Sequence, residues 1–234
     1  MRPGLYPTGD LSFLTSRISS MKKNMHKKVS LDAAALVACD IWLFLLEENH
    51  GLPFNHILGK LPRQKEEWFV DASSQGYGGV CGTSYFKISH KTFLSLVKST
   101  AKVKCCDMFI AYRELLAVLL AFQVFARIAP QRFVRINSDN TNVVSWLNKG
   151  RCSKQLGFLL LSAIEFFKYK FGLRIKAYYI KSKHNTSADG LSRGHTPHWL
   201  GWRGVKLKND VNEIIQLLDD PLPFWQTKKR NYPL

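Results

Sequence analysis

The sequence has few acidic residues and few cysteines for its length. Only 17 Asp and Glu stand against 34 Lys and Arg in 234 residues, which gives a formal net charge of +17 at pH 7. This excess predicts a polyanionic partner, either a nucleic acid or an anionic membrane surface, and says nothing about the fold. The five cysteines are odd in number and include no Cys-x-x-Cys pair, so they indicate reduced thiols rather than a disulfide framework or a zinc site.

Long apolar runs and targeting signals are missing as well. The most apolar stretch, residues 33–46, is too short to cross a bilayer and contains Asp40. No apolar segment with the flanks of a signal peptide lies near the N-terminus. We therefore expect no membrane partner and an intracellular location, in the nucleus or the cytoplasm.

Composition divides the chain into three parts. Residues 1–60 are predicted to be a basic lead-in followed by a connection helix over 31–46. Residues 66–193 form the main domain, and residues 194–234 form a C-terminal tail with a short helix at 210–218. Apolar residues make up 46% of the chain, which is enough for a globular domain with a hydrophobic core.

The main domain alternates between strand-like and helical patterns. Its order predicts an α/β fold in which a mixed β-sheet is flanked by helices. The expected strands are 66–72, 80–88, 132–137 and 173–180, with a further short strand near 107–111. A Gly-rich turn is expected at 73–79, and the expected helices are 112–126, 138–148, 154–170 and one beginning near Thr186.

Four acidic residues occur where packing alone does not favour a charge. Asp71 ends a strand, Glu114 lies inside an apolar helix, Asp139 follows a strand and Asp189 begins a short helix. Each has an ordinary alternative, namely a turn residue, a paired surface charge, a helix N-cap and an exposed helix position, respectively. Together they predict a carboxylate cluster at one edge of the sheet, for which a divalent cation with oxygen ligands is the natural counter-ion.

Four short segments that contain these acids resemble a known family. They are FVDASSQGYGG at 69–79, YRELLA at 112–117, NSDNT at 137–141 and NTSADGLSR at 185–193. In this order they resemble the four motifs of the type 1 ribonuclease H domain of retroelement reverse transcriptases, most closely that of DIRS-like (tyrosine-recombinase) retrotransposons. The segment 31–53 likewise resembles the connection that precedes this domain. The resemblance implies a ribonuclease H-like fold and, as a partner, an upstream reverse transcriptase region.

The resemblance also implies a metal-dependent endonuclease that hydrolyses the RNA strand of RNA–DNA hybrids. The four acids match the family's D-E-D-D set, which holds two Mg²⁺ ions, with Mn²⁺ as an alternative, to activate a water and stabilise the leaving oxygen. A His that the family usually carries is replaced here by Tyr179. His184 lies close by in the sequence, in a different register, and is a candidate auxiliary group.

Basic residues are concentrated between positions 149 and 183, where nine Lys and Arg meet one acid, Glu165. Beside a phosphodiesterase site such residues are expected to neutralise phosphates and to make binding dependent on salt. Polar and small residues of the motifs are expected to contact the substrate as well. The predicted nucleic-acid-binding residues are Gly76, Ser138, Asn140, Lys149, Arg151, Lys181 and Lys183.

Two other interpretations stay open at this point. The first is a nucleic-acid-binding module that keeps the fold but is weak or inactive in catalysis, because the usual His is replaced and no Tyr-x-Asp-Asp polymerase signature is present. The second is an integrase or exonuclease of the same fold. It is less favoured because the last acid is Asp189 rather than Glu, and because Asp71-Ala-Ser73 lacks the Asp-x-Glu pair of the exonucleases.

Overall fold

The computed structural model describes Cys39 and the residue ranges 66–96, 109–128, 133–152, 154–171, 173–196 and 201–205. The predicted lead-in and tail helix lie outside the described residues. Of the predicted connection helix only Cys39 is described, and it is helical.

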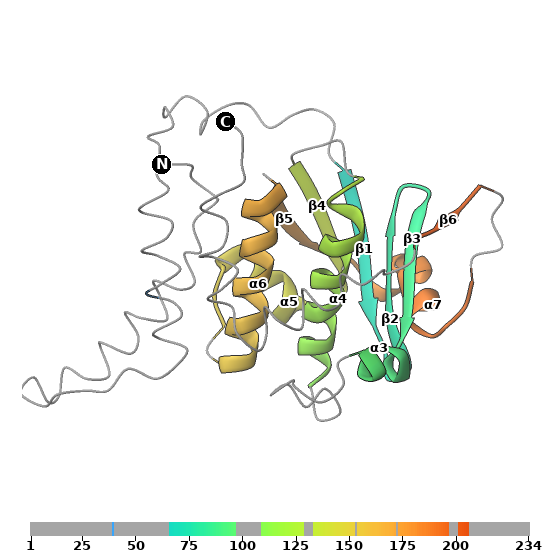
Figure 1. Ribbon diagram of the computed structural model, residues 1–234, viewed down its shortest axis with the longest axis horizontal. Helices are drawn as coiled ribbons and strands as arrows, with labels where there is room; N and C mark the ends of the chain where they lie inside the picture. Colours follow the sequence, from blue (N-terminus) through green and yellow to red (C-terminus); the bar gives the residue numbers. More distant parts are fainter. Residues whose placement is uncertain are drawn as a thin grey trace, which may run out of the picture.

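A six-stranded mixed β-sheet forms the centre of the described part, in the order β5-β4-β1-β2-β3-β6 (Figure 1). Strand β1 pairs antiparallel with β2, and β2 pairs antiparallel with β3. The pairs β1–β4, β4–β5 and β3–β6 are parallel. The strands are β1 (Glu66–Ala72), β2 (Gly76–Cys81), β3 (Ser84–Ser89), β4 (Phe133–Ser138), β5 (Arg174–Tyr179) and the short β6 (Arg203–Gly204).

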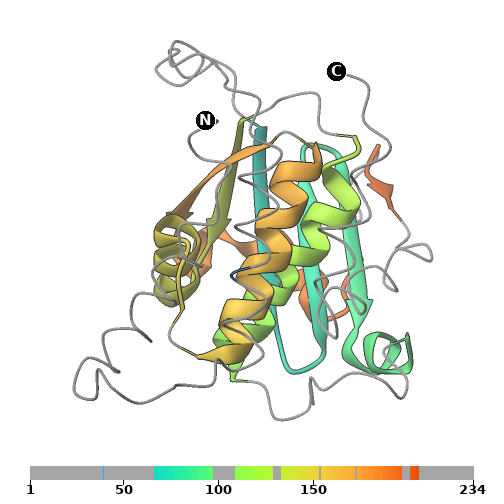
Figure 2. The same cartoon turned by 60° about the vertical axis from the view of Figure 1, so that its left-hand side comes forward.

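Helices cover both faces of the sheet. Helices α4 and α6 lie on one face and α7 lies on the other (Figures 1 and 2). The helices are α3 (His90–Leu96), α4 (Ile110–Phe125), α5 (Thr141–Lys149), α6 (Gln155–Phe171), the 3₁₀ turn η4 (Ser182–His184) and α7 (Thr186–Ser192). The predicted α/β class with a mixed, helix-flanked sheet is confirmed, and the strand order is compatible with a ribonuclease H-like fold. No helix among the described residues is long and apolar enough to cross a membrane.

The core forms between α4 and the sheet. Strand β1 is central, and its Trp68 and Val70 are almost fully buried. The Trp68 ring packs edge-on against Phe122 of α4, with ring centroids 5.1 Å apart, and against Phe125 at 5.6 Å. Such edge-to-face pairs are the favoured arrangement of aromatic rings. This packing explains why α4 has no polar stripe, since both the sheet and α6 cover it.

Two of the expected element boundaries are wrong. The turn expected at 73–79 is confined to residues 73–75, because β2 already begins at Gly76. The strand expected at 80–88 is divided at Gly82, whose positive φ of 56° allows a tight reversal between β2 and β3. Glycine signals both a turn and a close strand contact, and the sequence alone did not distinguish the two uses.

Two further expectations are corrected around the helices. The short strand near 107–111 is wrong for Ile110 and Ala111, which belong to α4. The N-cap of α5 is Asn140 rather than Asp139, because the Asn140 side-chain oxygen accepts from the backbone N–H groups of Asn142 and Val143. The ordinary explanation of Asp139 as a helix cap is therefore excluded.

Candidate active site

The four predicted acids lie toward one edge of the sheet, where β1 and β4 end. These two strands are parallel neighbours, so their carboxyl ends lie side by side. Phe69 pairs with Asn137, the last pair of this ladder, and Asp71 and Asp139 each follow two residues later in the chain. Glu114 reaches this edge from α4 and Asp189 reaches it from α7.

Asp71 is the most deeply buried of the four acids, with 6% of its surface exposed. Burial raises its pKa to about 7, which a hydrogen bond from Ser192 partly offsets and which the negative charges of Asp139 and Asp189 reinforce. Asp139 and Asp189 are therefore within electrostatic range of Asp71. A carboxyl in this position is destabilised as an anion unless a cation joins it.

Glu114 is buried in the same way, with 7% of its surface exposed. Burial raises its pKa to about 7; a hydrogen bond from Asn140 opposes this shift and the charges of Asp139 and Asp71 add to it. Ser138 Oγ donates to Glu114 Oε2 at 3.2 Å, and Asn140 Nδ2 donates to Oε1 at 3.1 Å. Both residues that flank Asp139 therefore donate to Glu114. Because Glu114 is buried, it is not a paired surface charge.

The other two acids are half-buried, and each has a polar partner. Ser182 Oγ in η4 donates to Asp139 Oδ2 at 2.6 Å. Arg193 Nε donates to Asp189 Oδ1 at 2.9 Å, and Arg193 Nη2 forms an ion pair with the same oxygen at 2.8 Å. Arg193 belongs to the fourth sequence motif, whereas nothing in the sequence pointed to Ser182, which lies outside the motifs and 43 residues from its partner.

Helix α7 is docked against β1 and β2 by two hydrogen bonds and by close packing. Asn185 Nδ2 donates to the carbonyl of Val70 at 3.0 Å, and Ser73 Oγ donates to the carbonyl of Ser192 at 2.8 Å. Gly78 leaves the space that α7 occupies, because a Cβ there would lie 2.6 Å from Leu191 Cβ. These contacts join the first motif to the fourth and set the position of Asp189. The sequence predicted the motifs but not this packing.

Gly76 has a structural role that the sequence did not suggest. We predicted that the glycines of the first motif lie in a turn open to a substrate. Gly76 instead begins β2 and is buried, and a Cβ there would collide with the backbone carbonyl of Ile88 in β3. The predicted contact of Gly76 with nucleic acid stays a prediction.

Most of the predicted basic residues lie on the surface. Lys149 is the last residue of α5 and Arg151 lies two residues beyond it. Lys181 and Lys183 flank the start of η4, and all four are exposed. The exception among the nine counted in the sequence is Lys168, which is buried in α6 and donates to both carboxylate oxygens of Glu165 at 2.6 Å. Lys168 is therefore removed from the basic surface.

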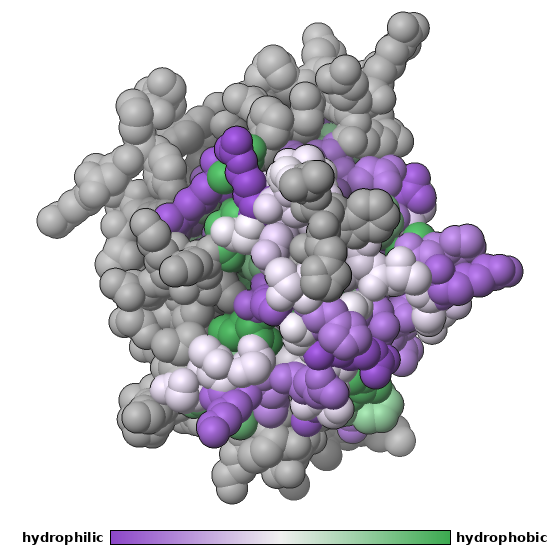
Figure 3. Space-filling model, turned by 90° about the vertical axis from the view of Figure 1, so that its right-hand side faces the viewer, coloured by the Kyte–Doolittle hydropathy of each residue, from purple (hydrophilic) through white to green (hydrophobic). Residues whose placement is uncertain are grey.

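The residues near the replaced family His are also exposed. Tyr179, which stands at that position, ends β5 with 51% of its surface exposed. His184 is exposed at the end of η4, where its backbone N–H donates to the carbonyl of Lys181. A further polar surface lies over α7, β3 and β6, where hydrophilic side chains predominate with only small apolar spots between them (Figure 3).

The donor set at the acidic edge fits a hard divalent cation. All four candidate ligands are carboxylates, the oxygen donors that Mg²⁺ and Mn²⁺ favour, and burial leaves two of them with raised pKa values. Within the described ranges, no three His, Cys, Asp or Glu side chains stand close enough together to form a ready-made metal site. The chemistry of the donors therefore suits the cation. In the structure, Glu114, Asp139 and Asp189 instead accept hydrogen bonds from other side chains.

A scan against protein-family models finds no match to this chain. A search of curated proteins likewise finds no significant relative.

Proposed function

We propose that the protein is a metal-dependent endonuclease that hydrolyses the RNA strand of RNA–DNA hybrids and derives from a retroelement. The observation that carries the proposal is geometric. Ser138 and Asn140, which flank Asp139, both donate to Glu114. Asn185 at the start of α7 donates to the carbonyl of Val70, next to Asp71. These acids come from four elements and span the four motifs. Packing alone gives no reason to collect four carboxylates at one edge.

The chain's own residues have distinct parts in this reaction. Asp71, Glu114, Asp139 and Asp189 would hold two Mg²⁺ ions, which when bound supply an activated water and charge stabilisation for an in-line attack on phosphate. Lys181 and Lys183 are exposed, eight and six residues before Asp189, and bind the phosphate backbone. Recognition of RNA then depends on 2′-hydroxyl and backbone contacts, so little sequence preference is expected.

The test is cleavage of a hybrid with a labelled RNA strand. We expect cleavage by the wild type in Mg²⁺ or Mn²⁺, none in EDTA, and a loss of activity in Asp71→Asn and in Asp139→Asn. Both variants keep the size of the side chain and remove its charge. Equal activity in all three proteins would exclude the proposed site.

The second candidate is a nucleic-acid-binding module that keeps the fold without efficient catalysis. It is favoured by two observations: Tyr179 stands where the family has a His, and the described residues contain no ready-made metal site. This function predicts hybrid binding that weakens with salt, together with no cleavage in any divalent metal. Binding and cleavage measured on the same hybrid distinguish the two functions.

A further inference from the structure

Asn140 joins two structural tasks that the sequence did not connect. Its side-chain oxygen accepts from the backbone N–H of Asn142 at 2.9 Å and of Val143 at 3.4 Å, and so caps α5. Its side-chain nitrogen donates to Glu114 Oε1 at 3.1 Å. One side chain therefore connects the start of α5 to an acid on α4.

The orientation of the Asn140 amide follows from these partners. The two backbone N–H groups can only donate, so the atom that faces them must be the oxygen. The nitrogen is then left to face Glu114, whose Oε1 accepts its hydrogen bond. The cap thus determines that Asn140 presents a donor to Glu114.

Ser138 completes the arrangement from the other side of Asp139. Its hydroxyl donates to Glu114 Oε2 at 3.2 Å and accepts from the Asn140 backbone N–H at 3.1 Å. Ser138 is fully buried and Asn140 is half-buried, so the Ser138 contact is shielded from solvent and the Asn140 contact is partly shielded. Each Glu114 oxygen accepts one hydrogen bond and keeps a second lone pair for another partner.

We propose that Asn140 and Ser138 are positioning residues that fix the Glu114 carboxylate for metal binding, rather than residues that contact nucleic acid. This inference rests on the proposed function, and it replaces the role that the sequence suggested for both residues. Partners that orient a metal-binding side chain in this way commonly change metal affinity by about 10-fold to 100-fold when they are removed.

The variant Asn140→Ser separates the two tasks of Asn140. Serine is a good N-cap and keeps the acceptor for α5, but it has no amide nitrogen that reaches Glu114. Ser138→Ala removes the second donor without altering the cap. The matched control is Asn142→Ser, the same replacement at an exposed position of the same helix.

The first readout is Mn²⁺ binding to the full chain without nucleic acid. The electron paramagnetic resonance signal of free Mn²⁺ measures how much of the ion remains unbound. We expect Asn140→Ser and Ser138→Ala each to weaken Mn²⁺ binding about 10-fold or more, and Asn142→Ser to leave it unchanged. Thermal unfolding, measured alongside, shows whether Asn140→Ser is folded. If this variant is unfolded, Ser138→Ala carries the test.

The second readout is cleavage of the hybrid. Positioning predicts a higher Mg²⁺ requirement and a lower kcat with little change in KM for the hybrid. Unchanged Mn²⁺ binding together with a raised KM would show a substrate contact and overturn the inference. A wild type that binds Mn²⁺ but does not cleave refutes the nuclease proposal and leaves the inference standing if the variants bind Mn²⁺ more weakly. A wild type that binds no Mn²⁺ overturns both.

Discussion

Gly78 of β2 and Leu191 of α7 are so close that no side chain fits between them. A Cβ at position 78 would lie 2.6 Å from both Leu191 Cβ and the Ser192 backbone nitrogen, and 2.7 Å from the carbonyl oxygen of Ala188. Two of these three atoms are backbone and cannot turn aside. The position of α7, and with it that of Asp189, depends on the absence of a side chain at Gly78.

The first prediction concerns this contact. Gly78→Ala is expected to lower the free energy of unfolding by about 1–3 kcal/mol, because overpacking displaces α7 from the sheet. Urea denaturation measures the loss. Gly190→Ala within α7 is the matched control, since its nearest non-neighbouring atoms, in His195, are 3.8 Å from the new Cβ. It should be neutral or slightly stabilising, because alanine favours a helix more than glycine does. A destabilisation of the same size in both variants would contradict the packing explanation.

The second prediction concerns pH. The folded-state pKa values of Asp71 and Glu114 are about 7, above the ordinary 3.8 and 4.5. The folded state therefore binds more protons than the unfolded state between about pH 4 and 7, so the stability from these groups is present below that window and is lost as the pH rises through 7. Without metal, the Tm of the wild type should fall more between pH 5 and pH 8 than the Tm of Asp71→Asn. An identical loss in both proteins would refute the raised pKa of Asp71.

The third prediction adds the metal at the upper end of this window. At pH 8 the two buried carboxyls are ionised and repel their neighbours, so a bound cation should stabilise the folded state. We expect Mg²⁺ to raise the Tm of the wild type in a concentration-dependent way and to have a much smaller effect on Asp71→Asn. Na⁺ at matched ionic strength controls for screening. An equal response of both proteins to Mg²⁺ would speak against a metal site at Asp71.

The fourth prediction concerns the buried ion pair of α6. Lys168→Met leaves the Glu165 carboxylate buried without its partner, which should cost about 3–5 kcal/mol of unfolding free energy. Burial raises the pKa of Glu165 and Lys168 opposes the shift, so the remaining carboxyl should become protonated in the variant. The double variant Glu165→Met/Lys168→Met should recover most of the loss, as measured by chemical denaturation. If the double variant is as unstable as the single one, Lys168 does not stabilise the protein by neutralising Glu165.

The fifth prediction concerns the exposed basic residues of the loop before α7. Lys181→Ser/Lys183→Ser should weaken hybrid binding and reduce the dependence of log K on log salt by roughly one for each lost phosphate contact. Lys176→Ser, an exposed residue within β5, is the control and should change the slope less. Fluorescence anisotropy at several salt concentrations gives both quantities. An unchanged slope in the double variant would remove these lysines from the interface.

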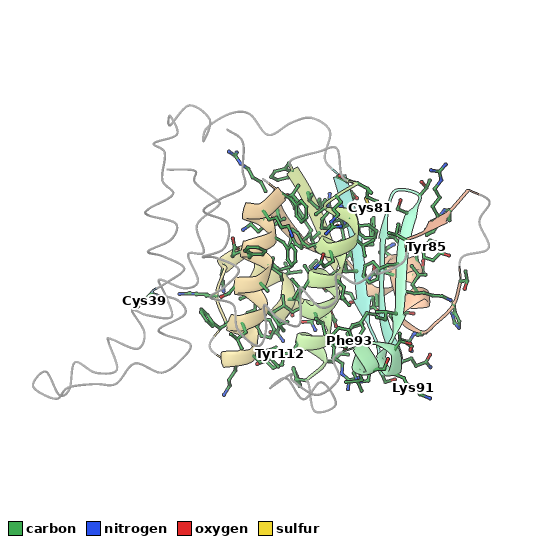
Figure 4. All side chains as sticks on the ribbon, viewed as in Figure 1. Cys39, Cys81, Tyr85, Lys91, Phe93 and Tyr112 are labelled. Atoms are coloured by element: carbon green, nitrogen blue, oxygen red, sulfur yellow. The ribbon has the colours of Figure 1, made fainter. Side chains whose placement is uncertain are left out.

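The side chains outside the acidic edge illustrate why surface roles are hard to predict. Figure 4 shows Lys91 on the outer side of α3 and Tyr112 near the start of α4. Tyr77, inside the first motif, is fully buried. Trp146, close to the third motif, is half-buried and stacks on Tyr112 with ring centroids 5.4 Å apart. An aromatic residue next to a motif looks the same in sequence whether it faces the core or the solvent.

Local patterns in the sequence determined the elements and the motifs. The strand Glu66–Ala72 has the predicted boundaries, and α4, α6 and α7 begin within about two residues of the expected positions. These elements follow from apolar periodicity and from breaks in it, which are properties of neighbouring residues. The order of the four acids along the chain likewise indicated one edge of a sheet.

Tertiary structure alone decided which side chains hold those acids. Ser182 donates to Asp139, which lies 43 residues away in the chain. Lys168 is buried, although in the sequence it looks like the exposed lysines around it. The glycines of the first motif proved to be strand residues because α7 and β3 press against them. Such contacts join residues that are far apart in the chain. No pattern within one segment records them, because hydrogen bonds and steric exclusion act between atoms that only folding brings together.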